Sequence, residues 1–406
     1  MKPHMSMLVQ RRHLCTGVAI VASGMAVAEM VRSFSGWTTT DFLASLAAAH
    51  LLLSHAHQLY SAQSQAAMEV RLTGQAAHQW VRYIYPPLYA GLLLPLAGLS
   101  PNIGLLIWDL FLVGIEFFAC SLIAAAAASS SARRPIFFSA LAACATTGAG
   151  FGIALGQSEA FILLGVAAAM YELSRGREWS AGACLFVTCI KPQDMLGILV
   201  VLLLSRRWKI LAAWAAGGVV WVASSLVLVG PHAMGQFFSL ASHDDNMPFL
   251  VLSGGVTGAL AQMAQSPLPA YVAAGVILIL GAWVLNRYRA RLLSPPLLLP
   301  TGICLAVAAD PKFLAYGALL FAVLLPAVAC RSQWAAAAVW VATDLCYIGT
   351  GNVVIPVVSP LQVVLNLIPV VAVVALYLWA TLGAEDGNPW GTARVSSIGE
   401  AAAVGS

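Results

Sequence analysis

The sequence predicts an all-α, polytopic integral membrane protein with about 12 transmembrane helices, and two observations carry this prediction. Of the 406 residues, 60% are apolar and only 9% are charged, against roughly 25% charged in a typical soluble domain. Apolar runs near or above about 18 residues recur along the chain, separated by short loops. A soluble protein would have to bury those runs in several cores, and too few polar residues exist to cover them.

The basic residues predict which side of the membrane each loop faces. They cluster in short loops, and short loops rich in Lys and Arg stay in the cytoplasm. These loops are QRRH (10–13), SARRP (131–135), SRGRE (174–178), SRRWK (205–209), NRYRAR (286–291) and CRSQ (330–333). The formal net charge of +4 is small and spread over them, so it indicates topology and not nucleic-acid binding. We expect a multi-pass protein of the plasma (inner) membrane with both termini in the cytoplasm.

The apolar segments between these loops are the predicted spans. They lie near 14–31, 136–152, 159–173, 179–190, 195–205, 209–229, 269–286, 296–309, 313–329, 334–348 and 361–382. The stretch 86–130 needs an odd number of crossings, and we assign it one crossing plus a re-entrant or interfacial piece, which makes twelve. We expect residues 1–383 to form one transmembrane domain and the small-residue-rich segment 384–406 to be a disordered cytoplasmic tail.

The N-terminal segment has a second interpretation. A basic start, an apolar run and AVA at 26–28 together resemble a secretory signal peptide with its cleavage site. Because the rest of the chain is itself membrane-bound, we expect a retained first span.

Polar and ionisable groups collect in the loops of the opposite, outer face. These loops are 32–85, GQSE (156–159), IKPQD (190–194), 230–249, ADPK (309–312) and GTGN (349–352). A transporter would place charges near the membrane midplane, on two repeated halves. No internal repeat is found, and only Asp109, Glu116 and Asp344 lie inside apolar runs. This distribution favours an enzyme whose active site opens at the outer face, with a lipid or solute transporter or flippase as the alternative.

Asp41 is the first candidate functional residue, in the stretch TTTDFLASLAAAHLLLSHAHQLY (38–60). It precedes a helical pattern and is therefore either a helix cap or a functional carboxylate; Thr40 would cap equally well. His50, Ser54 and His57 recur at i, i+4 and i+7 and predict one polar face. We therefore expect an amphipathic helix that lies in the membrane surface.

Two lysines at outer-face helix junctions are candidate anion-binding groups. CIKPQDMLG (189–197) contains Lys191, and VAADPKFLAYG (307–317) contains Lys312. Each lysine either pairs with a nearby carboxylate, Asp194 or Asp310, or binds a phosphate beside a helix N-terminus.

The remaining motifs have structural interpretations. Pro86 and Pro87 in RYIYPPLYAGLLLPL mark a helix start, and Tyr83 and Tyr85 fit the aromatic belt of a membrane interface. The eight cysteines lie singly, without a C-x-x-C pair. SHDDN (242–246) is read as a solvated turn in preference to a metal site, so neither a metal nor another cofactor is predicted.

Taken in order, these stretches resemble the polyprenyl-phosphate-dependent glycosyltransferases of family 87, a GT-C-fold group that includes the mycobacterial α-mannosyltransferases of phosphatidylinositol mannoside synthesis. The resemblance rests on DFLASLAAAHLLLSHAHQLY, YIYPPLYAGLLLPL, GQSEAFILL, SAGACLFVTCIKPQDMLGILVVLLLSRRWK and DPKFLAYGALLFAVLLP. The chain departs from the family pattern where Ala44 and Ser45 replace a Tyr pair, and where Asp310-Pro311-Lys312 replaces Ser-Pro with a nearby His or Trp. The departures leave the sugar and the acceptor open.

The resemblance implies a GT-C fold and an inverting transfer of a hexose, with mannose favoured, from a polyprenyl-phosphate donor to a lipid or glycan hydroxyl. Asp41 would be the general base. The donor phosphate would be held by Lys191 and Lys312, with Arg71, Arg82 and His243 behind them. Tyr85, Gln157 and Asp310 would position the substrates. The expected partners are membrane lipids, the prenyl-linked sugar and the acceptor, with no nucleic acid.

Overall fold

The computed structural model describes residues 41–74, 82–127, 130–242, 255–311, 315–350 and 360–383. Within these ranges the chain is helical and contains no strand, which confirms the predicted all-α class. The predicted first span and the C-terminal tail lie outside the described residues, so the division of the chain after residue 383 stays a prediction.

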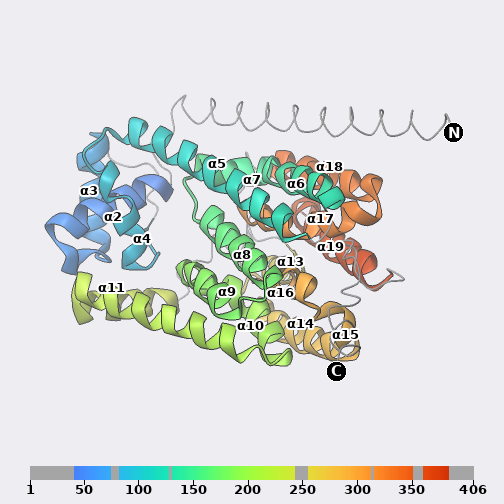
Figure 1. Cartoon of the computed structure of the whole chain (residues 1–406). Coiled ribbons are helices and arrows are strands. Elements are labelled where there is room, and N and C mark those ends of the chain that lie inside the picture. Colours follow the sequence, from blue (N-terminus) through green and yellow to red (C-terminus); the bar gives the residue numbers. More distant parts are fainter. Residues whose placement is uncertain are drawn as a thin grey trace, which may run out of the picture.

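The N-terminal half begins with a cluster of short helices and continues into longer ones (Figure 1). The short elements are α2 (Asp41–Ser54), η1 (Ala56–Gln58), α3 (Ala62–Thr73), α4 (Pro87–Leu92) and η2 (Leu94–Leu96). They are followed by α5 (Pro101–Ala126), α6 (Ser130–Cys144), α7 (Thr147–Ala154), α8 (Glu159–Ser174), α9 (Glu178–Leu185), η3 (Phe186–Ile190), η4 (Pro192–Met195) and α10 (Leu196–Leu204).

The C-terminal half is built mostly of longer helices. These are α11 (Trp208–Ser242), α13 (Gly255–Ala264), α14 (Leu268–Arg287), the short α15 (Arg289–Leu292), α16 (Pro295–Ala309), η5 (Ala315–Leu320), α17 (Phe321–Arg331), α18 (Gln333–Thr350) and α19 (Pro360–Leu382). In Figure 1, α5 and α11 run from the α2–α4 cluster along two sides of the molecule, with α8, α9 and α10 between them.

Helix α2 differs from the predicted surface helix. It ends at Ser54, so His57 falls on the separate turn η1. Most of its residues are buried, from Phe42 through Ala49, because α3, α4 and η2 pack around it. The prediction of an amphipathic helix in the membrane surface is therefore wrong for α2. The periodicity of three polar residues was outweighed by the run of Ala and Leu between them.

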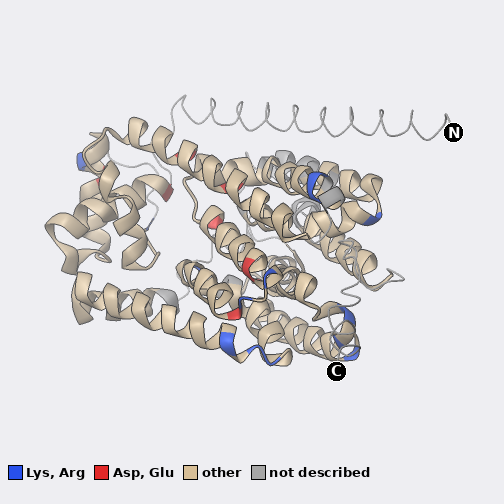
Figure 2. Cartoon of the chain, in the orientation of Figure 1, with Lys and Arg blue, Asp and Glu red and all other residues tan. Residues whose placement is uncertain are grey.

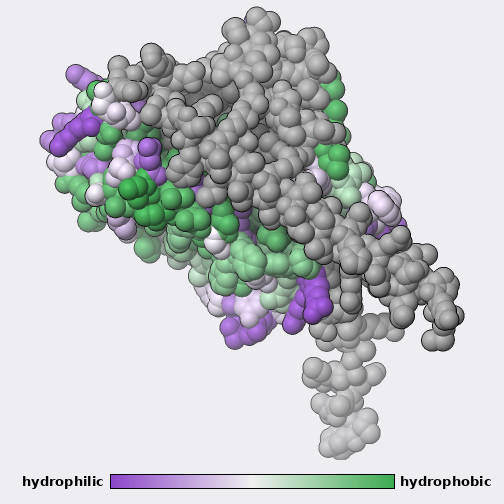
Figure 3. Space-filling model, turned by 90° about the horizontal axis from the view of Figure 1, so that it is seen from above, coloured by the Kyte–Doolittle hydropathy of each residue, from purple (hydrophilic) through white to green (hydrophobic). Residues whose placement is uncertain are grey.

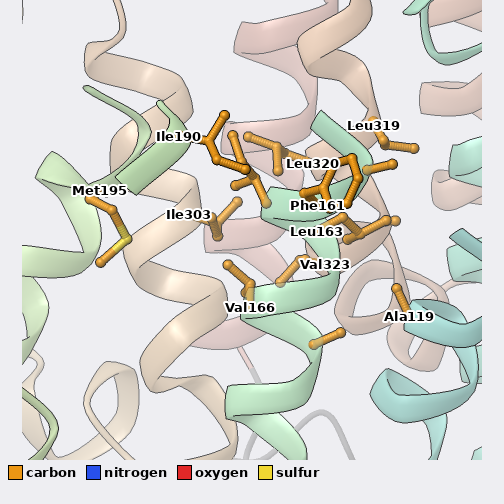
Figure 4. Close-up of a cluster of buried hydrophobic side chains, with 14 of the residues drawn as sticks. Ala119, Phe161, Leu163, Val166, Ile190, Met195, Ile303, Leu319, Leu320 and Val323 are labelled. Carbon is orange, nitrogen blue, oxygen red and sulfur yellow. The ribbon is translucent and has the colours of Figure 1, made fainter. Parts of the chain in front are cut away.

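Helix α8 is the central helix of the bundle. It packs against α5, α9, α16 and η5, and its side chains are buried along most of their length. Figure 4 shows its apolar face meeting the neighbouring elements. The labelled residues of this core are Ala119, Phe161, Leu163, Val166, Ile190, Met195, Ile303, Leu319, Leu320 and Val323. This burial holds the start of α8, which carries Glu159, in a fixed place.

Helices α10 and α16 cross at glycine contacts. A Cβ built on Gly197 would lie 2.2 Å from the Ala306 backbone nitrogen, and one on Gly302 would lie 2.8 Å from the Ile198 Cα. Small residues allow such close backbone approach, a common device between membrane helices. Gly197 lies at the start of α10 and Ala306 near the close of α16, and the rest of α10 stays in contact with α16, so the two helices run antiparallel. The start of α10 therefore lies at the same end as the close of α16.

Fewer helices meet the criteria for a full membrane span than were predicted. Among the described residues, α5, α11 up to Leu240, and α14 are long and apolar enough to cross, and α6 with α7 adds a fourth if that pair, bent by 62°, is counted as one span. The stretch 86–130 contains one such helix, α5, preceded by the short helices α4 and η2. Several other predicted spans are short helices packed inside the bundle, so twelve crossings are not shown.

The exposed apolar side chains support membrane embedding. Val227 on α11 is 87% exposed and Ile279 on α14 is 72% exposed. Figure 3 shows hydrophobic side chains in a band, with hydrophilic ones towards either end of it. Contiguous apolar surface of this kind is rare on soluble monomers and typical of surfaces that contact lipid or protein.

Part of the predicted outer loop 230–249 is helical. The chain kinks at Gly230, where φ is 79° and ψ is 168°, and then continues as helix to Ser242. Phe237 on this segment contacts Tyr60, with ring centroids 5.5 Å apart. The expectation of an irregular loop is therefore corrected for 231–242: Pro231 begins a second helical segment, as proline commonly does.

The basic turns lie at one end of the helices that surround α8. Basic turns follow α8, α10 and α14, Arg331 closes α17, and Arg133 lies in the first turn of α6. Figure 2 shows most Lys and Arg at the ends of α6, α11 and α15, away from the α2–α4 cluster. The start of α8, the start of α10 and the close of α16 form the opposite end. The basic turns and the polar junctions at the start of α8, the start of α10 and the close of α16 thus lie at opposite ends of the bundle.

Candidate active site

Asp41 is the first residue of α2 and is half-buried. The chain is anchored immediately after it, because the Phe42 backbone N–H donates to the Leu155 carbonyl at 2.9 Å. This bond ties the start of α2 to the turn between α7 and α8. Asp41 thereby reaches the start of the central helix, although more than a hundred residues separate them in sequence.

The turn at Gly156 makes this anchoring possible. Gly156 ends α7 with φ of +70°, and the Gln157 N–H returns to the Gly152 carbonyl at 2.9 Å, the arrangement of a Schellman cap. A Cβ at Gly156 would lie 2.6 Å from the Phe42 Cβ. The Gly156 carbonyl accepts hydrogen bonds from the Tyr89 hydroxyl and from the Trp108 indole, at 3.1 and 3.2 Å. Only glycine satisfies both the backbone angle and the contact.

Glu159 and Lys191 form an ion pair beside this turn. Glu159 lies in the first turn of α8 and is buried, and one of its carboxylate oxygens accepts from the Lys191 ammonium. Lys191 is placed by the break between η3 and η4, where its backbone N–H donates to the Thr188 carbonyl at 3.0 Å. Pro192 prevents the helix from continuing without a break. The Lys191 side chain is only 11% exposed.

Tyr85 and Gln157 complete the cluster. The Tyr85 hydroxyl donates to the Gln157 side-chain oxygen at 2.6 Å. The Lys191 ammonium lies 5.5 Å from the centre of the Tyr85 ring, within the range of a cation–π contact. Tyr85 therefore belongs to the site and is more than the interface aromatic that its position in the sequence indicates.

The charges of this cluster act on Asp41. Burial raises the pKa of Asp41 from 3.8 to about 6, while Lys191 lowers it and Glu159 raises it. An opposite charge favours an ionised carboxylate and a like charge disfavours it. Asp41, Glu159 and Lys191 are thus close enough to influence one another, and a carboxyl group with this pKa can exchange protons near neutral pH.

The other candidate cations have different surroundings. Arg82 donates to the Tyr60 carbonyl at 3.2 Å. Arg71 is exposed on α3 and, after burial, is the second cause that lowers the pKa of His50. Neither is among the groups that shift the pKa of Asp41. Lys312 and His243 lie outside the described residues.

Asp310 closes α16 at the same end as the start of α10. Its backbone carbonyl accepts from the Thr257 hydroxyl at 2.6 Å. The packing of α10 against α16 places Asp310 on the side of the bundle that carries Lys191. The suggested partner of Lys191, Asp194, has a side chain outside the described part. Within the described part, Lys191 forms an ion pair with Glu159.

Glu159 was not predicted as a site residue from the sequence. GQSE was recognised as a polar junction, but only Gln157 was singled out within it. The available signal was a second acidic residue at the start of an apolar helix, on the face rich in polar loops. Such a residue also suits the positive end of a helix dipole, so position alone does not distinguish a site residue from a favourable first turn.

The described acids inside apolar runs, Asp109 and Glu116, are not among the groups that shift the pKa of Asp41. Asp109 and Glu116 are buried on α5, seven residues apart on one face, and the side chain of Asp344 is outside the described part. Within the described ranges, no three His, Cys, Asp or Glu side chains are grouped so as to hold a metal ion.

Comparison with known proteins identifies the family. The sequence model of glycosyltransferase family 87 matches residues 83–311, which is more than half of the chain. The chain belongs to glycosyltransferase family 87. It is accordingly a membrane glycosyltransferase, in agreement with its apolar helices. No curated protein and no solved structure matches the chain significantly.

The family match covers most of the cluster in this glycosyltransferase. Tyr85, Gln157, Glu159 and Lys191 fall inside the matched residues, as does Asp310. Asp41 precedes them. Its place in the site therefore rests on the packing of α2 against the Gly156 turn and on its electrostatic contact with Glu159 and Lys191.

Proposed function

We propose that this enzyme transfers a hexose from a polyprenyl-phosphate donor to a hydroxyl group of a lipid or glycan acceptor, with Asp41 as the general base. The observation that carries the proposal is the juxtaposition of Asp41 with the Lys191 ammonium at the start of the central helix. A carboxylate that takes up a proton and a cation that receives a phosphate are the two groups that this reaction needs.

The reaction is a single displacement. The acceptor oxygen forms a bond to the anomeric carbon, its proton passes to Asp41, and the bond from that carbon to the phosphate oxygen breaks. The prenyl phosphate leaves with the electron pair. A cation placed where this negative charge develops lowers the barrier, and Lys191 is the described candidate. Attack opposite the leaving group inverts the anomeric centre, so a β-linked donor gives an α-linked product.

The remaining predicted residues belong to the proposal in supporting roles. Gln157 and Tyr85 are proposed to position substrate hydroxyls, since their side chains already form one hydrogen-bonded pair. Asp310 is proposed to position substrate from the same end of the bundle. Lys312, Arg71, Arg82 and His243 are proposed as further cations for the donor phosphate.

The proposed donor requires a site that opens at one surface of the membrane. A prenyl chain lies in the bilayer while its phosphate and sugar stay at the surface, so the site must open at one face of the membrane. The cluster lies at the helix ends opposite the basic turns, and basic turns favour the cytoplasm. We therefore propose that transfer takes place at the outer face of the plasma (inner) membrane. Mannose is the favoured sugar, by resemblance to the family members named above.

The test is sugar transfer by the purified Asp41→Asn enzyme. Wild-type enzyme, incubated with a panel of radiolabelled prenyl-linked monosaccharides and a membrane-lipid extract as acceptor, should label a lipid or glycan with one of them. The Asp41→Asn enzyme should bind that donor and transfer at least about 100-fold more slowly, the scale expected for loss of a general base.

Asp109→Asn is the matched control, because it neutralises a buried aspartate of α5 outside the cluster. Its transfer rate should stay close to that of the wild type. Undiminished transfer by Asp41→Asn would remove the assignment of the base. If the wild type transferred none of the donors in the panel, the polyprenyl-phosphate part of the proposal would fall.

A further inference from the structure

The ion pair of Lys191 bears on how the proposed base works. Among the described residues, the Lys191 ammonium forms an ion pair with Glu159 and also lowers the pKa of Asp41. Among the described residues, no ion pair joins Lys191 directly to Asp41. Glu159 and Asp41 both attract the Lys191 ammonium. How readily Asp41 accepts a proton therefore depends on which of the two carboxylates pairs with Lys191.

The surroundings of Glu159 favour this choice. Its side chain is 5% exposed, and the central helix that carries it is packed on several sides. A buried carboxylate without a cation is strongly unfavourable, so Glu159 retains the ammonium. The centre of the Tyr85 ring also lies 5.5 Å from that ammonium, and the hydrogen bond to Gln157 fixes the Tyr85 hydroxyl.

We propose that Glu159 is a positioning residue that holds the Lys191 ammonium away from Asp41, so that Asp41 stays free to accept a proton. This inference rests on the proposed function. Direct pairing with Lys191 would occupy the oxygens of Asp41 and make it a weaker base. With Glu159 in place, the ammonium stays near enough to receive a phosphate while it leaves the base available.

The charged groups around Asp41 predict in which direction its pKa changes when Glu159 is neutralised. Among the described residues, the charged groups that act on Asp41 are Lys191 at the η3–η4 break and Glu159 on α8. The charge of Asp41 in turn raises the pKa of the Tyr89 hydroxyl on α4. Removing the Glu159 charge takes away a group that raises the pKa of Asp41. It also releases Lys191 to pair with Asp41, which lowers that pKa further. Both effects lower the pKa of Asp41.

The experiment is an infrared titration of the Asp41 carboxyl group in the purified enzyme. The C=O band of protonated Asp41 is identified by its loss in Asp41→Asn. In the wild type it should titrate near pH 6. In Glu159→Gln the midpoint should fall by at least about one pH unit, the scale for an opposite charge that comes into direct contact. The acid limb of the pH–rate profile should move to lower pH in parallel, since transfer needs ionised Asp41.

A double variant separates positioning from folding. In Glu159→Gln/Lys191→Gln both charges are removed without leaving either one unpaired. Because Lys191 lowers the pKa of Asp41 more than Glu159 raises it, the midpoint should lie above that of the wild type. A general loosening of the site would expose Asp41 and shift both variants downward. A lower midpoint in Glu159→Gln together with a higher midpoint in the double variant is therefore expected only for the proposed arrangement.

Glu172→Gln is the matched control, because Glu172 is also an ion-paired glutamate of α8 but lies near Arg177 at its other end, 3.6 Å away. Its midpoint should equal that of the wild type. An unchanged or raised midpoint in Glu159→Gln would overturn the inference, even if transfer by the wild type upheld the proposed function. The titration needs no transfer, so it also decides the inference if no donor is accepted.

Discussion

Gly156 shows how one residue without a side chain brings the site together. Its φ of +70° ends α7, its missing Cβ admits Phe42, and its carbonyl accepts two hydrogen bonds from aromatic side chains. Asp41 directly precedes Phe42. The place of the proposed base is therefore determined by a turn that carries no chemistry of its own.

Gly156→Ala should lower both the stability of the enzyme and its rate of transfer. An alanine at positive φ costs on the order of 1–3 kcal/mol, and its Cβ would overlap with Phe42, 2.6 Å away. The matched control is Gly74→Ala, where φ is also +70° but no atom lies within 4 Å of the added Cβ. Thermal unfolding in detergent should show a larger loss for Gly156→Ala. Equal losses would show that contact with Phe42 is unimportant.

Lys191 illustrates what residue spacing reveals and what it leaves open. Its position beside Pro192, on the face poor in basic loops, was sufficient to select it as a functional candidate. Its partner was not predictable, because Glu159 lies 32 residues away in the chain and rules of helical spacing reach only three or four residues. The carboxylate suggested by the motif was Asp194, three residues after Lys191; its side chain lies outside the described part, and the ion pair described for Lys191 is with Glu159.

At the scale of helices, the α10–α16 crossing determines where Lys191 and Asp310 lie. Both residues are at one end of this antiparallel pair, and the backbones meet at Gly197 and Gly302. Dispersion forces and close backbone packing hold membrane helices together in the absence of a strong hydrophobic effect. The crossing is therefore sensitive to a single added methyl group.

Gly197→Ala should destabilise the enzyme by about 1–3 kcal/mol, the usual range for overpacking, because the new Cβ would lie 2.2 Å from the Ala306 nitrogen. Gly275→Ala on α14 is the control: no atom lies within 4 Å of its Cβ, so it should be neutral or stabilise by up to about 1 kcal/mol through helix propensity. Denaturant unfolding of both variants measures the difference. Only Gly197→Ala should lower the free energy of unfolding, and a neutral Gly197→Ala would contradict the close crossing.

Two elements show the limits of helical patterning. The i, i+4, i+7 spacing in the first loop predicted a polar face, yet α2 is buried and ends before the third polar residue. The segment after Gly230 was expected to be a loop because of its glycine, proline and polar residues, yet it is helical. In both cases packing against neighbouring helices outweighed the local composition.

At the scale of the whole molecule, the basic turns and the proposed site lie at opposite ends of the central helices. The two ends therefore differ in chemistry as well as in position. This separation makes the orientation in the membrane testable without any substrate.

Single cysteines in a cysteine-free background should report this orientation. Gln63→Cys on α3 and Lys209→Cys on α11 both replace exposed residues. In intact cells, a membrane-impermeant maleimide should label Gln63→Cys and leave Lys209→Cys unlabelled until the cells are permeabilised. The reverse pattern would place the site in the cytoplasm and exclude an outer-face reaction.

Resemblance to family 87 supplied Tyr85 and Gln157 as site candidates. The sequence by itself determined the helical membrane class, the helix start at the Pro86-Pro87 pair and the choice of Asp41 and Lys191 as candidates. These follow from composition, backbone chemistry and the sorting of charge, which are local properties. Only the tertiary structure decided that Lys191 pairs with Glu159, that α2 is buried and that the Gly156 turn holds Asp41 near both. Those contacts join segments far apart in the chain, and their energies depend on burial, which no local pattern specifies.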